Sequence, residues 1–137
     1  MVRLLGVLVL AAAVAGCVSS PLPTAEMARP AKVHVPDLTI SAPGKARITV
    51  KRDVGGPGAR KCANLILIDG KSAIDLDYGQ GATLYVDPGE RIVSLRFDNW
   101  ICRTADVDLA VIADVQREKV VRLVPNAQGV ALQQATP

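Results

Sequence analysis

The chain has 137 residues, of which 50% are hydrophobic and 3% aromatic, and its formal net charge at pH 7 is +3. Basic and acidic side chains are interspersed, so no basic stripe points to nucleic-acid binding. The few aromatic residues argue against stacking platforms for single strands or sugars. The composition favours one small domain with an aliphatic core.

Residues 1–16 have the pattern of a secretory signal peptide. Arg3 is the only charged residue before Cys17, and an apolar run from Leu4 to Ala15 follows it. The run is shorter than the roughly 20 apolar residues that span a bilayer. An uncleaved interfacial helix is the alternative interpretation.

The tetrapeptide Val14-Ala15-Gly16-Cys17 closes this run and resembles the lipobox of bacterial lipoproteins. The resemblance implies cleavage before Cys17, which then carries a diacylglyceryl group and an N-acyl chain such as palmitate. More than one acyl chain gives stable membrane anchoring. Val18 follows where an aspartate would favour inner-membrane retention in many family members. We therefore expect a lipid-anchored protein of the outer membrane that faces the periplasm.

Two further cysteines, Cys62 and Cys102, remain after the lipidated one. Because an exported chain meets an oxidising compartment, we expect them to form one disulfide. Closing a loop of about 40 residues stabilises the folded state by roughly 4 kcal/mol in the chain-entropy model. Two buried free thiols are the alternative.

The mature chain divides into three predicted parts. Five prolines in residues 17–45 predict a flexible tether, which would reach roughly 70–80 Å from the membrane at about 3.1 Å per residue. Within it, Val33 to Val35 is a possible edge strand. Residues 46–125 are the predicted folded domain, and the polar residues 126–137 a disordered tail.

The folded part reads as a series of short strands separated by turn signals. Ala46, Ile48 and Val50 alternate with polar residues, and Asp69-Gly70 is a strong type I′ hairpin signal. About seven strands at this spacing predict an all-β fold, a small antiparallel β-sandwich. The expected strands are 46–51, 62–68, 72–76, 82–86, 91–97, 107–111 and 120–124.

The stretch from Arg47 to Phe97 is similar to the repeat unit of PEGA-like domains. The matching segments are Ile48 to Arg52, Leu67 to Lys71, the Gly81 turn and Tyr85 to Glu90. The resemblance implies an antiparallel sandwich at an envelope surface that makes protein contacts, with no shared enzymatic activity. Its motifs are turn motifs, so it bears on fold and location only.

No pattern in the sequence specifies catalysis, a cofactor or a metal site. The only histidine, His34, lies in the predicted tether, away from any nucleophile pattern. Asp75 and Asp77 share a strand face but are too few for calcium, so a solvated face is the preferred interpretation. We expect a protein that is not an enzyme and binds no cofactor, metal or nucleic acid.

A surface for a partner is predicted near the expected disulfide. Trp100 is either an aromatic residue packed over the disulfide, the preferred interpretation, or a partner contact. The disulfide would bring Arg60 and Lys61 close to Arg103, where they could meet an acidic partner or anionic lipid.

The expected function is that of a non-enzymatic envelope lipoprotein. Its disulfide-linked sandwich would bind another envelope protein of unspecified identity. One alternative is a periplasmic inhibitor or ligand-binding lipoprotein, for example of a cell-wall hydrolase, acting through the loop Gly55 to Lys61. The other is an accessory lipoprotein of a secretion or pilus assembly.

Overall fold

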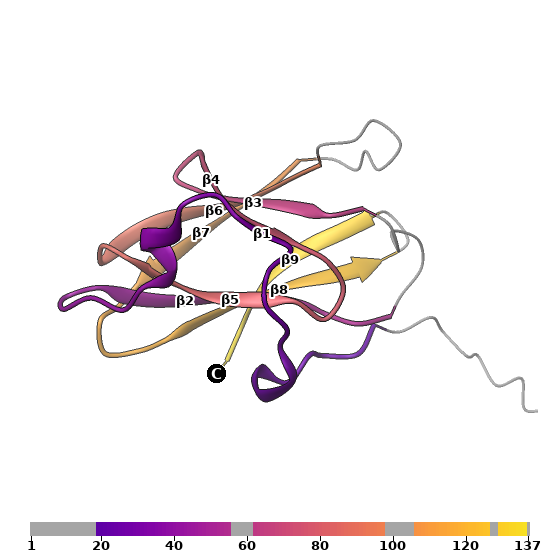
Figure 1. Cartoon of the computed structure of the whole chain (residues 1–137), viewed down its shortest axis with the longest axis horizontal. Coiled ribbons are helices and arrows are strands. Elements are labelled where there is room, and N and C mark those ends of the chain that lie inside the picture. Colours follow the sequence, from indigo (N-terminus) through magenta and orange to yellow (C-terminus); the bar gives the residue numbers. More distant parts are fainter. Residues whose placement is uncertain (1–18, 56–61, 98–105, 127–128, 137) are drawn as a thin grey trace, which may run out of the picture.

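A computed structural model describes residues 19–55, 62–97, 106–126 and 129–136. These residues form two packed β-sheets, which confirms the predicted all-β sandwich (Figure 1). One sheet has the strand order β1-β4-β3-β6-β7 and the other β5-β2-β8-β9. The strands are β1 (Lys32–Val33), β2 (Ala46–Arg52), β3 (Asn64–Ile68), β4 (Lys71–Leu76), β5 (Gly81–Val86), β6 (Gly89–Phe97), β7 (Val107–Ala113), β8 (Lys119–Asn126) and β9 (Gly129–Ala135).

The core lies between the two sheets and consists of the inward-facing aliphatic residues, which occupy alternate positions along strands β2 to β9. In β2, Ile48 and Val50 are fully buried, as the period of two predicts. β3 lies between β4 and β6. Asn64, Ile66 and Ile68 of β3 are buried, and Leu65 and Leu67 on its other face are half-buried.

Turn residues set the connections as predicted. Asp69 and Gly70 have φ values of 50° and 79°, the two positive values that the type I′ turn between β3 and β4 requires. Gly89, with φ of 112°, begins β6 after Pro88. β2 and β5 pair antiparallel, whereas β2 and β8 pair in parallel.

The predicted flexible tether is wrong for the residues that the structure describes. Residues 19–45, here called the N-terminal strap, lie along the sandwich from Ser20 to the start of β2, and contain the short 3-10 turns η1 (Thr24–Glu26) and η2 (Pro36–Thr39) (Figure 1). The strap forms backbone hydrogen bonds with β4 and with the start of β5. In each case it lies along the edge of the strand that faces away from the rest of its sheet.

The prolines of the strap are compatible with this order because an edge segment needs donors on one side only. Pro21 lies between Ser20 and Leu22, whose amides both donate to the sandwich. The Ala31 amide, next to Pro30, donates to Asp75 O at 3.0 Å, and the His34 amide donates to Ala73 O at 2.8 Å. Pro21 and Pro30 therefore occupy positions between residues whose backbone amides form the hydrogen bonds to the sandwich.

The predicted disordered tail is also wrong. Residues 129–135 form β9, which pairs antiparallel with β8 and completes the second sheet. Val130 and Leu132 alternate with the more exposed Gly129, Ala131 and Gln133 and are only 6% and 9% exposed. The folded domain therefore extends beyond the predicted limits of 46–125 at both ends, and the described residues hold nine strands instead of about seven.

Candidate interaction surfaces

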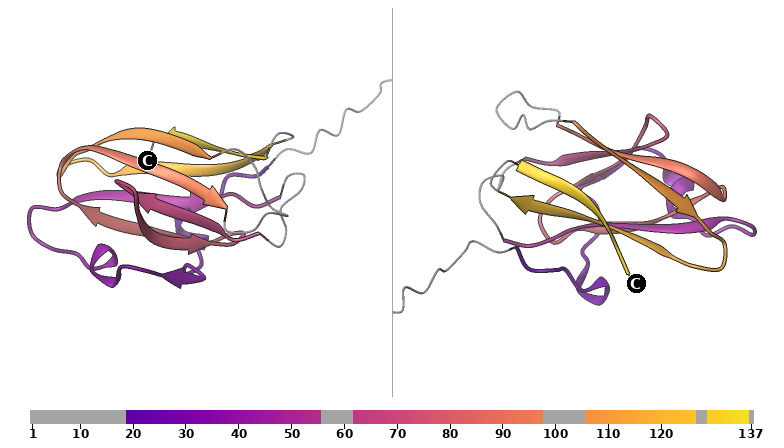
Figure 2. Two further views of the ribbon diagram at one scale, coloured as in Figure 1. Left: turned by 90° about the horizontal axis from the view of Figure 1, so that it is seen from above. Right: turned by 180° about the vertical axis from the view of Figure 1, so that it is seen from behind.

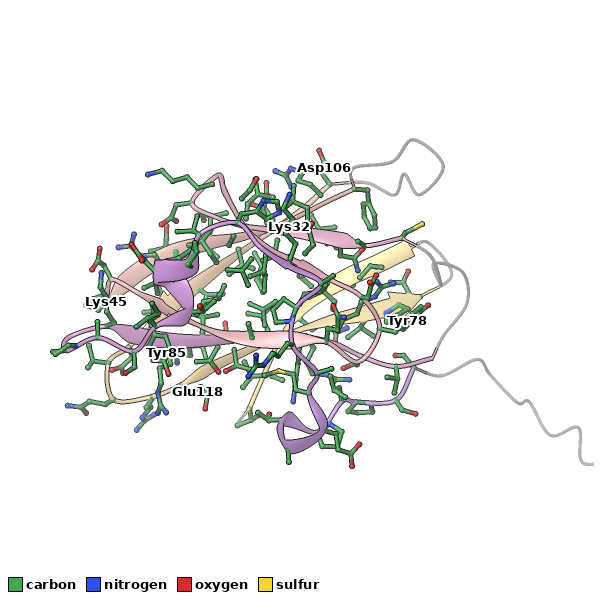
Figure 3. All side chains as sticks on the ribbon, viewed as in Figure 1. Lys32, Lys45, Tyr78, Tyr85, Asp106 and Glu118 are labelled. Carbon is green, nitrogen blue, oxygen red and sulfur yellow. The ribbon has the colours of Figure 1, made fainter. Side chains whose placement is uncertain are left out.

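The sandwich has two ends that differ in chemistry. The entry end is where the chain enters the described structure at residue 19; the distal end is opposite. Figure 3 shows Tyr78 and Asp106 toward the entry end and Lys45 and Glu118 toward the distal end. Register fixes which strand termini share an end: β2 and β8 both finish at the entry end, and β5 and β9 both begin there.

The entry end contains a buried arginine. Arg52 is fully buried; its Nη1 donates to Cys62 O at 2.8 Å and to Leu76 O at 3.1 Å. Its guanidinium carbon lies 4.2 Å from the centre of the Tyr78 ring, a cation–π distance. Burial lowers the pKa of Arg52, and Tyr78 and Asp77 oppose that shift. This arginine joins β3 and β4 to the end of β2 and is a structural group.

A second buried charge lies beside it. Asp53 is fully buried and forms an ion pair with Arg122 of β8, whose Nε donates to Oδ1 at 3.2 Å. The Leu22 amide donates to the same Oδ1 at 3.2 Å. The Asp53 carboxylate therefore connects β2, β8 and the N-terminal strap.

The distal end carries a groove of about 630 Å³ between the starts of β2 and β8 and the end of β9. Three basic side chains line it: Arg47, Arg117 and Lys119. Among the described residues none of the three forms an ion pair. The groove is therefore an electropositive hollow, here called the distal groove.

The single acidic side chain in the distal groove is already engaged. The Glu118 carboxylate accepts a hydrogen bond from Thr49 Oγ1, which also lies 2.7 Å from Thr83 Oγ1. Thr49 is fully buried although it lies on the outer face of β2. Glu118 thus holds the loop before β8 against β2 and leaves the three cations of the groove facing solvent.

Sequence reasoning missed this groove. The run Arg117-Glu118-Lys119 is visible in the sequence. Arg47 is 70 positions from Arg117, and only the parallel pairing of β2 with β8 brings the two together. No local signal in the sequence predicts that pairing.

Most predicted site residues lie outside the described residues: Cys17, Arg60, Lys61, Trp100, Cys102 and Arg103. Cys62 is described, is half-buried and precedes β3. Because Cys102 is not described, the Cys62–Cys102 disulfide stays a prediction, as does the partner surface. The inhibitor alternative depends on a loop of which residues 56–61 are not described.

His34 and Asp75, which the sequence places far apart, meet in the structure. His34 Nε2 lies 2.9 Å from Asp75 Oδ1, and both side chains are about a quarter exposed. Together with the pairing of β1 and β4, this contact fixes the strap on the first sheet. Asp75 is therefore partly solvated and holds the strap through His34.

In the part of the chain that the structure describes, no group of three or more His, Cys, Asp or Glu side chains is placed to hold a metal ion. The same residues include no helix with the length and hydropathy needed to cross a membrane. No protein-family model, curated protein or solved structure matches the chain. The resemblances to bacterial lipoproteins and to PEGA-like domains therefore remain predictions.

Proposed function

We propose that this chain is a non-enzymatic lipoprotein of the bacterial envelope whose sandwich binds another envelope protein. The lipobox Val14 to Cys17 supports acylation at Cys17 and an outer-membrane location facing the periplasm. The strap bonds to the sandwich from Ser20 onward, only three residues after Cys17. The sandwich is therefore the part of the protein that partners would contact.

We further propose that the partner binds through an acidic surface at the distal groove. The observation that carries this proposal is that Arg47, Arg117 and Lys119 surround a groove of about 630 Å³ without an ion-pair partner among the described residues. Electropositive hollows steer acidic partners and fix their orientation. A protein surface rich in Asp and Glu has the complementary chemistry.

Site-specific photocrosslinking in intact cells tests the partner proposal. A crosslinking amino acid at Thr136, which lines the groove, should give one discrete product whose second component is the same protein in repeated mass-spectrometric identifications. The double charge reversal Arg47→Glu with Arg117→Glu should reduce its yield at least tenfold. A product with unchanged yield, or no product, would contradict the proposal.

A matched control keeps the change in net charge constant. Arg29 and Lys32 are exposed, like Arg47 and Arg117, but lie on the strap. The reversal Arg29→Glu with Lys32→Glu should leave the crosslink intact. A loss in both double variants would indicate a general electrostatic effect instead of a groove-specific one and would also count against the proposal.

Intact-mass analysis of the membrane fraction tests the anchor. The wild-type protein should have lost residues 1–16 and gained the mass of a diacylglyceryl group and an acyl chain, and Cys17→Ser should remain unprocessed. Adding a reductant should raise the mass by about two daltons if Cys62 and Cys102 are bonded. An unmodified wild-type chain in the soluble fraction would overturn the anchor.

A further inference from the structure

We infer that the lipid anchor holds the sandwich end-on and close to the bilayer, with the entry end toward the lipid and the distal groove away from it. This inference rests on the proposed acylation of Cys17. It adds an orientation and a distance, which follow from where the strap is attached.

The first step is the length of chain between the lipid and the fold. Cys17 precedes Ser20 by three residues, which span at most about 10–11 Å when fully extended. Whatever conformation this short segment adopts, the first folded residue lies within that distance of the acylated cysteine. The reach of roughly 70–80 Å expected for a flexible tether is therefore excluded for the folded strap.

The second step is the strength of the attachment at Ser20. The Ser20 amide donates to Val54 O at 2.8 Å, and the Val54 amide donates back to Ser20 O at 3.2 Å. Two residues later, Leu22 is 4% exposed and its amide donates to Asp53. Releasing this segment would expose an apolar side chain and remove a hydrogen bond to a buried carboxylate, so both terms oppose detachment.

The third step is that detachment at Ser20 alone would not free the strap. Ala28 donates to Gly79 O at 2.9 Å and accepts from the Gly81 amide at 3.0 Å. Further along, β1 pairs with β4. The strap is thus held at several separate points along the sandwich, and the left view of Figure 2 shows it running along one side of the sheets.

The charges of the entry end suit a lipid surface. Two aspartates at this end form ion pairs with arginine: Asp53 pairs with Arg122, and Asp106 Oδ2 lies 3.5 Å from Arg96 Nε. Paired carboxylates repel anionic headgroups less than free ones. Among the described residues of this end, Val54 is an exposed apolar side chain, with 38% of its surface accessible.

The consequence is a fixed height for the distal groove. A strand of seven residues such as β2 is about 20–23 Å long, so the groove would stand roughly 20–30 Å from the bilayer surface. A partner that binds the distal groove must therefore do so close to the membrane. Its acidic surface must face the membrane.

Fluorescence energy transfer on acylated protein tests the orientation. The protein is purified from membranes, placed in vesicles of phosphatidylethanolamine and phosphatidylglycerol with an acceptor-labelled lipid, and labelled through a bio-orthogonal amino acid. One label replaces Asp106 at the entry end and another replaces Gln116 at the distal end, both exposed. The apparent distance to the bilayer should be shorter from position 106 by about 20 Å, one strand length.

The matched control restores a long tether. Inserting twenty Gly and Ser residues between Val18 and Ser19 should increase both distances and make them nearly equal. Equal distances in the uninserted, acylated protein, or a shorter distance from position 116, would overturn the orientation. Intact mass is measured first: an unacylated chain would overturn the proposed anchor, whereas an acylated chain with equal distances overturns this inference alone.

Discussion

The Asp53 carboxylate forms an ion pair with Arg122 and accepts the backbone amide of Leu22, so one buried side chain joins two strands of a sheet to the N-terminal strap. Asp53 is fully buried, and the Arg122 side chain is 22% exposed. Such a group stabilises only while all its partners are present, because a lone buried charge is costly.

We therefore expect Asp53→Asn to destabilise the fold by about 1.5–3 kcal/mol, the usual range for hydrogen bonds to charged groups. Urea unfolding of the unlipidated domain measures this loss. Asp87→Asn is the control, because Asp87 pairs with Lys45 at the surface and its side chain is 70% exposed. Similar losses in both variants would contradict the role given to Asp53.

Gly81 is the second test of the strap. A Cβ atom at this position would lie 2.6 Å from Val50 O and would overlap the Met27 sulfur atom. We expect Gly81→Ala to displace the strap and to cost about 1–3 kcal/mol, as overpacking does. Trypsin should then cleave after Lys32 faster than in the wild type, whereas the Arg29–Pro30 bond resists trypsin in either protein.

Two further variants make this test specific. Met27→Ala in the Gly81→Ala background should restore only part of the stability, because the contact with Val50 O remains. Gly70→Ala, at a positive φ of 79° with nothing near its Cβ, should strain the hairpin without faster cleavage of the strap. Equal cleavage in both glycine variants would contradict the contact between Gly81 and the strap.

The sequence predicted the central strands and turns because their signals are local. Alternation in Ala46 to Val50 and the pair Asp69-Gly70 each report on neighbours a few residues away, and both are confirmed. The prediction of a flexible tether is wrong because proline content shows only which backbone amides are missing. It does not show which acceptors the remaining amides bond to. Leu22 and Ala31 bond to residues more than thirty positions away.

The distal groove could not be predicted from the sequence for a related reason. Arg47 and Arg117 become neighbours only through a parallel pairing of two strands far apart in the chain. Charge alternation along the chain, the feature that argued against a basic stripe, says nothing about which cations the fold brings together.

Asp69 supplies a pH-dependent prediction. The Ile92 amide donates to its Oδ1 at 2.9 Å, and Arg91 Nη1 donates to its Oδ2 at 2.9 Å. The hydrogen bond from the Ile92 amide is the largest cause that lowers the pKa of Asp69; partial burial opposes it, and Arg91 adds to the lowering. Since the folded-state pKa is the lower one, ionised Asp69 stabilises the fold above the unfolded pKa of about 3.9. That contribution is lost as the pH falls through the folded value.

Asp69→Asn separates this charge from the turn, because asparagine tolerates the positive φ of 50° at this position. The variant should be less stable than the wild type at pH 7 by about 1 kcal/mol or less, given the partly exposed pair. The difference should shrink toward pH 3. Urea midpoints at the two values measure it, and a difference that does not change with pH would contradict the assignment.

The last prediction concerns β9. Leu132 pairs with Leu123 of β8, which is fully buried, and is itself 9% exposed. We expect Leu132→Ala to cost about 2–4 kcal/mol, because it removes core contacts and leaves a cavity. Gln133→Ala, one residue later and exposed, should change stability by no more than about 0.5 kcal/mol. A chain that ends at Asn126 should lose cooperative unfolding, because it leaves the edge of β8 unpaired and removes Val130 and Leu132 from the core. Equal stability of the wild type, Leu132→Ala and this shortened chain would mean that residues 129–135 contribute nothing to the core.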